Sequence, residues 1–264
     1  MAGTQLEPTT RTGPVPRPSP RPRPVPEKAV LGRKALAEFV GTAFLVAAIV
    51  GSGITASRLS PGDVGLELLE NTLATAAALA AVILAVGPVS GAHLNPVITL
   101  VDRFFGGVSA KDACVYITAQ FAGGVTGAVA ANTMFGQAVV SLSTHQRASR
   151  PHLIAEAIAT AGLILVVFGL TRSGRAHAAP FAVGAYIAAA YWFTSSTSFA
   201  NPAVALGRMC SNTFAGIAPG SVAPFMGAEL VGGALGACCV AVLYPKGRRR
   251  ALEVVAIVPH EEAP

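Results

Sequence analysis

The 264-residue chain is 52% hydrophobic and only 12% charged, and its mean hydropathy is +0.57. Because soluble domains carry roughly 25% charged residues, this composition excludes an ordinary soluble protein and indicates an integral membrane protein. The excess of basic residues, 19 against 13 acidic, is spread along the chain rather than gathered in one patch with aromatic residues, so it does not indicate nucleic-acid binding.

Residues 1–34 are rich in proline and arginine and have no apolar periodicity. Such a segment cannot build a core, which predicts a disordered arm. It has no apolar stretch followed by a small-residue cleavage site, so it does not have the pattern of a secretory signal. We interpret it as a cytoplasmic tail, with a ligand for a proline-recognising domain as the alternative. Residues 246–264 are predicted to form a second, shorter cytoplasmic tail.

Six apolar stretches are long enough to cross a bilayer, which takes roughly 20 residues each. They predict an all-α membrane protein with six transmembrane helices in one domain over 35–245. The stretches are about 36–56, 68–89, 113–135, 153–171, 179–199 and 222–244.

A glutamate lies early in the first and in the fourth stretch, as Glu38 and Glu156. An ionisable group in a membrane segment is costly unless it has partners. We therefore expect both carboxylates to accept hydrogen bonds from loop amides or loop side chains. The alternative is that each lies at the level of the lipid headgroups.

Two apolar stretches are each followed by an Asn-Pro pair, in segment 90–97 (SGAHLNPV) and segment 198–204 (SFANPAV). Asparagine is a preferred N-cap and proline a preferred first helical residue, so short half-helices are predicted over about 95–106 and 201–214. Both would begin inside the membrane. Irregular backbone at that depth is tolerated only where it lines a cavity, so the pattern favours a pore.

The two halves of the chain repeat each other, about 35–140 and 150–245. Glu38 returns as Glu156, Asn95 returns as Asn201, and the segment 119–128 returns as 228–237, in the same order. Each half holds three spans, an odd number, so the second half must be inverted in the membrane. Inverted repeats bring their interrupted segments together near the midplane.

Pairs of glycines four residues apart occur in the repeated segments, in the third and the sixth stretch. Small residues at this spacing share one helix face and let two backbones approach closely in lipid. We predict helix contacts at Gly123, Gly127, Gly232 and Gly236.

These motifs resemble those of the aquaporin, or major intrinsic protein, family. Segment 90–97 resembles the first signature of that family, with Val97 where alanine is usual, and Asn201, Pro202 and Ala203 match the second. The resemblance implies six transmembrane helices and two re-entrant half-helices, assembled as a homotetramer in the cell membrane. It also implies passive passage of small uncharged solutes, with no cofactor, no metal and no enzymatic reaction.

In such a pore, Asn95 and Asn201, each followed by its proline (Pro96 and Pro202), would offer amide hydrogens to a passing oxygen atom while the half-helix dipoles disfavour cations. His93 is expected to brace the first loop rather than to act as a ligand or a base. Backbone carbonyls are expected to form a ladder of acceptors along both loops. The expected carbonyls are those of Gly91, Ala92, His93, Ser198, Phe199 and Ala200.

Most members of the resembled family have an arginine directly after the second signature, whereas this chain has Val204. The resemblance implies that Thr75, Ala189 and Ser198 are the other three mouth positions, which predicts a wide mouth without a charge. Such a mouth suits glycerol, urea or an undissociated metalloid acid, and the resemblance to bacterial arsenite-associated channels ranks arsenous acid first. Arg208, one turn beyond Val204, is expected to face the outer surface or a loop; the alternative is that it swings back and replaces the missing charge.

Other functions are less well supported by the residues. A water-selective channel is the first alternative, and an ion-coupled secondary transporter, which also has inverted repeats, is the second. The cysteines have no spacing typical of a metal site and are interpreted as small core residues, with a thiol site for arsenic as the alternative. They are Cys114, Cys210, Cys238 and Cys239.

The distribution of basic residues predicts the orientation in the membrane. If both termini are cytoplasmic, most lysines and arginines lie inside, as basic loop residues usually do. Only Arg58, Arg147, Arg150 and Arg208 then lie outside or near the outer face.

Overall fold

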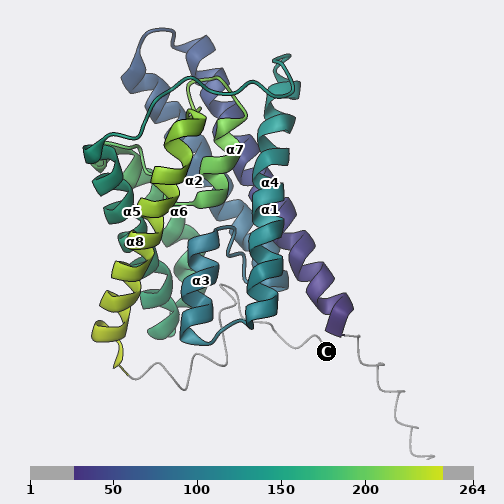
Figure 1. The fold of residues 1–264 in the computed structure, drawn as a ribbon, viewed down its shortest axis with the longest axis vertical. Coiled ribbons are helices and arrows are strands. Elements are labelled where there is room, and N and C mark those ends of the chain that lie inside the picture. Colours follow the sequence, from purple (N-terminus) through teal and green to yellow (C-terminus); the bar gives the residue numbers. More distant parts are fainter. Residues whose placement is uncertain (1–26, 246–264) are drawn as a thin grey trace, which may run out of the picture.

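Residues 27–245, which the computed structural model describes, fold into eight α-helices and one short 3₁₀ helix, with no strand in that range (Figure 1). The resulting all-helical bundle agrees with the fold class predicted from the sequence. The α-helices are α1 (Glu27–Leu59), α2 (Val64–Ser90), α3 (Pro96–Phe105), α4 (Ala110–Met134), α5 (Arg150–Arg172), α6 (Ala179–Phe193), α7 (Pro202–Met209) and α8 (Pro219–Leu243), and the 3₁₀ helix is η1 (Ala176–Ala178).

The helical domain begins earlier than predicted. Helix α1 begins at Glu27, whereas the predicted tail extended to residue 34. No proline occurs between Pro26 and Pro61, so nothing in that stretch interrupts a helix. The rest of the predicted N-terminal tail and the predicted tail over 246–264 lie outside the described residues.

Five helices within 27–245 are long and apolar enough to cross a bilayer, namely α1, α2, α4, α5 and α8. The predicted fifth span, 179–199, is shorter in the structure, because α6 ends at Phe193 after 15 residues. The sequence that follows, TSSTS over 194–198, competes for the backbone through its hydroxyl groups. Thr197 and Ser198 have positive φ angles of 61° and 49°, which a helix cannot continue through.

Equivalent helices of the two repeats make equivalent contacts. The most extensive packing is α1 against α4 in the first repeat and α5 against α8 in the second. The half-helices α3 and α7 lie in opposite halves of the molecule in Figure 1, and the start of α1 lies at the same end as the end of α8. This arrangement is that of an inverted repeat with an even number of crossings.

The predicted glycine contacts occur where these helix pairs cross. A Cβ atom on any of Gly123, Gly127, Gly232 or Gly236 would collide with a main-chain carbonyl oxygen of the neighbouring helix. The oxygens belong to Phe39 and Ala43 on α1, and to Ala157 and Ala161 on α5.

Replacing Gly232 with alanine is therefore expected to lower the thermal stability of the purified protein in detergent. The added methyl group must push α8 away from α5, and overpacking of this kind costs about 1–3 kcal/mol. Gly227→Ala is the matched control, because Gly227 lies in the same helix and no neighbouring atom lies within 4 Å of the position that its Cβ atom would take. That variant should be neutral or slightly more stable, since alanine is the better helix former. Equal melting temperatures for the two variants would contradict the assigned contact.

Candidate functional site

Both half-helices begin at an asparagine that caps them. Asn95 Oδ1 accepts a hydrogen bond from the amide of Val97 at 2.9 Å, and Asn201 Oδ1 accepts one from Ala203 at 3.0 Å. A proline follows each cap as the first helical residue. Helix α3 covers nearly the predicted range, whereas α7 ends at Met209, five residues before the predicted end, because the short polar residues over 211–213 favour a turn.

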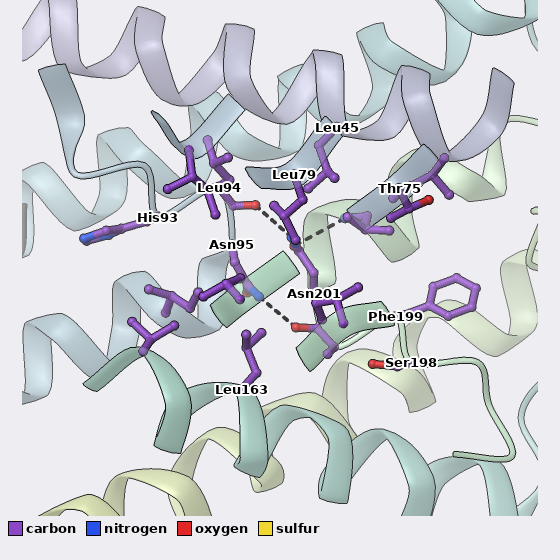
Figure 2. Close-up of a pocket in the computed structure, with 18 of the residues that line it drawn as sticks. Leu45, Thr75, Leu79, His93, Leu94, Asn95, Leu163, Ser198, Phe199 and Asn201 are labelled. Carbon is purple, nitrogen blue, oxygen red and sulfur yellow. Dashed lines mark hydrogen bonds between the residues drawn. The ribbon is translucent and has the colours of Figure 1, made fainter. Parts of the chain in front are cut away.

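The two caps meet in the middle of the bundle. Asn95 Nδ2 donates to the carbonyl oxygen of Ala200 at 2.7 Å, and Asn201 Nδ2 donates to that of Leu94 at 2.7 Å (Figure 2). Each loop therefore holds the asparagine of the other repeat. An amide nitrogen carries two hydrogens, so one hydrogen of each asparagine remains for a molecule in the cavity.

The two loops have the same backbone conformation. Ala92 and Leu94 have φ angles of 49° and 51°, and their equivalents Ser198 and Ala200 have 49° and 47°. Non-glycine residues rarely adopt these angles, and such strain persists only where the surroundings hold the chain.

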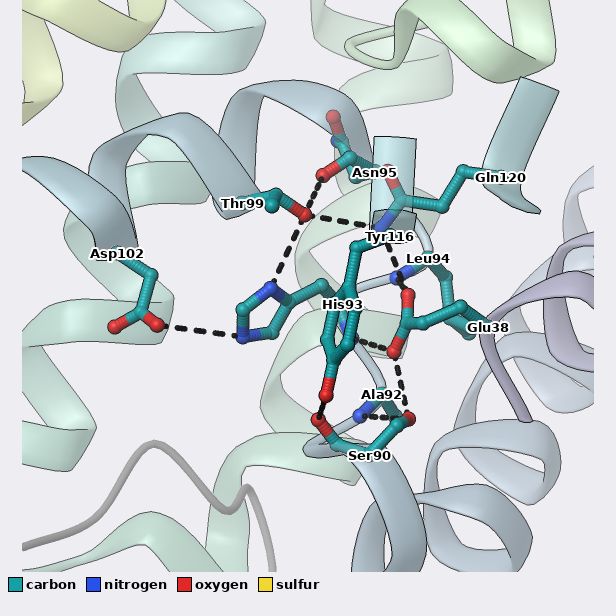
Figure 3. Close-up of polar contacts among 10 residues, drawn as sticks. All are labelled: Glu38, Ser90, Ala92, His93, Leu94, Asn95, Thr99, Asp102, Tyr116 and Gln120. Carbon is teal, nitrogen blue, oxygen red and sulfur yellow. Dashed lines mark hydrogen bonds and ion pairs between the residues drawn. The ribbon is translucent and has the colours of Figure 1, made fainter. Parts of the chain in front are cut away.

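Glu38 holds the first loop from behind (Figure 3). Its carboxylate is fully buried and accepts hydrogen bonds from the amides of His93 at 3.0 Å and Leu94 at 2.7 Å. It also accepts from Ser90 Oγ at 2.6 Å and from Gln120 Nε2 at 2.7 Å. These four donors satisfy a buried charge that would otherwise be costly in a membrane.

Glu156 has the same place behind the second loop. It is fully buried and accepts from the amides of Phe199 at 2.9 Å and Ala200 at 2.7 Å. A third carboxylate, Glu229 on α8, accepts from the amide of Asn201 at 2.9 Å. Glu229 was not identified from the sequence, although the repeat aligns it with Gln120, which would have been the signal to find it.

The His93 side chain contacts a buried polar cluster (Figure 3). Its Nδ1 lies 3.1 Å from Thr99 Oγ1, and its Nε2 lies 3.7 Å from Asp102 Oδ2. The ring also packs edge-on against Tyr116, with 5.3 Å between ring centroids. His93 thus braces the loop, and Asp102 is a member of this cluster that sequence reasoning did not identify.

One cavity connects the two caps. Its polar lining includes both asparagines, Thr75 and Ser198, and most of the remaining wall is formed by aliphatic side chains such as Leu45, Leu79 and Leu163 (Figure 2). It offers about 50 Å³ to the centres of water-sized molecules. Because one water needs roughly 10–15 Å³ on this measure, the cavity has room for a short file of small molecules.

Three of the four predicted mouth residues line this cavity, namely Thr75, Ser198 and Val204. The fourth does not, so the prediction for Ala189 is corrected. Ala189 is exposed on the outer face of α6, while Ile187 and Tyr191 of that helix line the cavity. A helix turns about 100° per residue, so position 189 faces away when positions 187 and 191 face inward.

Six residues of the two loops were predicted to offer carbonyl groups to the pore. Five of them line the cavity, namely Ala92, His93, Ser198, Phe199 and Ala200. Gly91 does not line the cavity. It is the C-cap of α2, with a φ angle of 88° and its amide bonded to the carbonyl oxygen of Gly87. The carbonyl oxygen of Ala200 accepts a hydrogen bond from Asn95, which leaves it one further lone pair.

The remaining signature residues pack behind the cavity, on glycines of the other repeat. A Cβ atom on Gly233 of α8 would collide with Val97, and one on Gly124 of α4 would collide with the carbonyl of Ala203. Pro96 and Pro202, the first residues of α3 and α7, are buried without lining the cavity. The valine at position 97 therefore packs against α8 and is not part of the cavity wall.

Arg208 was expected to face the outer surface or a loop, and it faces two loop segments and the cavity rather than the surface. Its side chain is 2% exposed and lines the cavity. The guanidinium carbon lies 3.5 Å from the centroid of the Phe199 ring, and Nε donates to the carbonyl oxygen of Ala215. Helical side chains lean toward the N-terminus of their helix, and a cation is attracted to an aromatic face, so the side chain turns back toward the loop. The expectation of an uncharged mouth is therefore wrong.

Three of the four cysteines differ from their predicted core positions. Cys210 is buried, whereas Cys114, Cys238 and Cys239 are exposed on α4 and α8. In the part of the chain that the structure describes, no three His, Cys, Asp or Glu side chains are grouped so that they could hold a metal ion.

Comparison with known proteins gives a family and several relatives. Residues 27–239 match the Major intrinsic protein family. Aquaglyceroporin AqpS of Rhizobium meliloti (strain 1021) is 42% identical over 234 residues, which cover 89% of this chain and 98% of that protein. The glycerol uptake facilitator protein of Pseudomonas aeruginosa is 28% identical over 239 residues, which cover 78% of this chain and 85% of that protein.

The fold is similar to that of a solved structure. The X-ray structure of the aquaglyceroporin from Plasmodium falciparum superimposes with a TM-score of 0.62 and covers 82% of this chain and 96% of that one. The sequence identity between the two is 23%, so this likeness concerns the fold alone.

Proposed function

Because this chain belongs to the major intrinsic protein family, we propose that it is a passive membrane channel for small uncharged solutes that carry hydroxyl groups, with glycerol as the representative. The observation that carries the proposal is the pair of capping asparagines, which lie at the centre of one cavity and each keep an amide hydrogen for a solute. The relative that covers nearly all of the chain is named an aquaglyceroporin.

The chemistry of the cavity supports selection for neutral solutes. The N-termini of α3 and α7 point toward each other, and each carries about half a positive charge, so the centre of the cavity disfavours cations. The wall is otherwise mostly aliphatic, which suits the carbon face of a polyol, while the asparagine amides suit its hydroxyl groups.

We further propose a multi-pass protein of the cell membrane with both termini cytoplasmic, assembled as a homotetramer with one pore in each subunit. The ends of the described chain lie on one side of the bundle (Figure 1). Large apolar side chains are exposed around the bundle, as expected for a surface covered by lipid or by neighbouring subunits. They include Phe44, Leu73, Phe104, Phe181 and Val242.

The test is solute flux into vesicles that contain the purified protein. Vesicles are mixed with glycerol, urea, arsenous acid or an impermeant osmolyte, and their volume is followed by light scattering. We expect rapid swelling in glycerol without any ion gradient, and empty vesicles are the control. The rate in arsenous acid, uncharged at neutral pH, tests the metalloid solute that ranked first on the sequence.

Two results would overturn the proposal, and each favours an alternative. Flux of water without glycerol, urea or arsenous acid would favour a water-selective channel. Solute flux that requires a proton or sodium gradient would favour a secondary transporter, for which the buried pair of His93 and Asp102 would be the candidate coupling group.

A further inference from the structure

Two buried carboxyl groups lie within hydrogen-bonding reach of each other behind the second loop, those of Glu156 on α5 and Glu229 on α8. We propose that this pair holds one proton, carried by Glu229, which makes Glu229 a hydrogen-bond donor that positions Asn201 and makes the channel sensitive to alkaline pH. The inference deepens the proposed function and rests on it, because it assigns a positioning residue to the loop that carries the second asparagine.

The amides of three consecutive loop residues bring the two carboxyl groups together. Those of Phe199 and Ala200 donate to the two oxygen atoms of Glu156, at 2.9 Å and 2.7 Å. The next amide, that of Asn201, donates to Glu229 Oε1 at 2.9 Å. Both carboxyl groups are fully buried. The two acids are therefore bound at adjacent positions of one backbone segment, with no water-exposed surface between them and the loop.

The first repeat shows which hydrogen bond joins the equivalent residues. Gln120, which the repeat aligns with Glu229, donates from Nε2 to Glu38 Oε2 at 2.7 Å (Figure 3). Glu38 is the equivalent of Glu156. An ionised glutamate has no hydrogen to donate, so Glu229 can make the equivalent bond only as a carboxylic acid. Its Oε2 atom is the place for the proton, because this atom is buried and has no other hydrogen-bond partner among residues 27–245.

A second negative charge would be poorly compensated at this place. The charged groups that act on the Glu229 carboxyl are Glu156 of α5 and Arg208 of α7, and α3 packs against α8 through the apolar Val97. Arg147, in the loop before α5, acts on Glu156. Within residues 27–245, no nitrogen of either arginine comes within 4.0 Å of a carboxylate oxygen. Two adjacent like charges without an ion-pair partner are costly away from water, so a shared proton is the more stable state.

The competing explanation is that both carboxyl groups are ionised and that Arg147 and Arg208 offset their charges at longer range. In that case Glu229→Gln would remove a stabilising charge, and it would leave the dependence of stability on pH unchanged above neutral pH. The two explanations therefore differ in the pH profile of this variant.

The experiment compares Glu229→Gln with the wild type between about pH 6 and pH 9 by thermal unfolding in detergent. A glutamine has its own amide hydrogens, so it reproduces the contact of Gln120 without a titrating proton. The folded wild type keeps a proton that an unfolded glutamate releases above about pH 4.3. Its ratio of folded to unfolded protein should therefore fall with rising pH by up to about tenfold per pH unit relative to the variant.

Infrared difference spectroscopy detects the proton itself. The wild type should show the C=O band of a protonated carboxyl group at neutral pH, and this band should be missing from Glu229→Gln. Where rising pH removes the band, the glycerol flux of wild-type vesicles should fall, because two repelling carboxylates no longer hold the amide of Asn201 in place. The flux of Glu229→Gln should stay constant over the same range.

The first repeat offers a matched gain of the same property. Gln120→Glu places two carboxyl groups behind the first loop, so it should add a second loss of stability with rising pH. Gln137→Glu, at an exposed glutamine, is the control and should match the wild type. If Gln120→Glu does not fold, the pH profile and the infrared band of Glu229→Gln decide.

The failures of the two proposals are distinguishable. If the wild type passes no glycerol at any pH, the proposed function fails, whatever the infrared band shows. If the wild type passes glycerol but Glu229→Gln leaves the band and the pH profile unchanged, the protonated pair is refuted and the channel stands. Loss of the wild-type band at high pH with a flux equal to that of Glu229→Gln would refute the positioning of Asn201.

Discussion

Replacement of Glu38 by leucine is expected to abolish solute flux and to destabilise the protein more than any other single change considered. Four donors would lose their acceptor, namely the amides of His93 and Leu94, Ser90 Oγ and Gln120 Nε2. Each buried unsatisfied donor costs about 1–3 kcal/mol. The loss would also release the strained backbone at Ala92 and Leu94, so the asparagine of the first loop would leave its place.

The measurement is thermal unfolding in detergent, together with glycerol flux in vesicles. Glu38→Gln should lie between the wild type and the leucine variant, because a glutamine keeps only one oxygen acceptor. Glu70→Leu is the matched control. Glu70 also lies in a membrane helix but accepts a single hydrogen bond, from Ser60 Oγ at 2.8 Å, and it is only partly buried. A melting temperature of Glu38→Leu equal to that of the control would refute the assigned brace.

The second large effect is expected from Asn201→Asp, a nearly isosteric change. An aspartate can still cap α7, because an Oδ atom can accept from Ala203 as it does now. It has no amide hydrogens, however, so it loses the bond to the carbonyl of Leu94 and the donor for a solute. It also places a negative charge between the two half-helix N-termini, where a cation would then be stabilised.

We expect this variant to lose most of its glycerol flux and to gain a cation leak, with less loss of stability than Glu38→Leu. Asn212→Asp is the control, because Asn212 is exposed and its Oδ1 accepts from the amide of Thr144, which a carboxylate also does. Wild-type glycerol flux through Asn201→Asp would show that the asparagine amide is not part of the solute path.

The half-helices illustrate what local sequence can predict. An asparagine followed by proline predicts a helix start from local sequence, because the capping Oδ1 atom accepts hydrogen bonds from residues two or three positions later. The internal repeat then places both starts at the same depth. The hydrogen-bonding role of Glu38 and Glu156 could be predicted for a related reason. An acidic residue inside an apolar span must have a partner, and the irregular loops supply free amides.

The residues of the cavity wall were predicted less accurately than the helix starts and the buried glutamates. The resemblance placed Ala189 at the mouth, but a resemblance in sequence takes no account of the short α6 and its irregular continuation over 194–198. An error of two residues turns a side chain by roughly 200° on a helix, from the cavity to the lipid. Tyr191, whose hydroxyl lies 3.4 Å from Thr75 Oγ1, occupies the wall instead.

The sequence alone determined the membrane class, the repeat, the helix starts at Asn95 and Asn201 and the glycine contacts, because hydropathy, caps and small residues act over a few neighbouring positions. Only the tertiary structure decided where Arg208 goes. Its partners are the ring of Phe199, nine residues before it, and the carbonyl of Ala215, seven residues after it, and both lie on irregular segments that no periodicity describes. A long side chain takes the most favourable contact within its reach, and that reach exists only after the chain has folded.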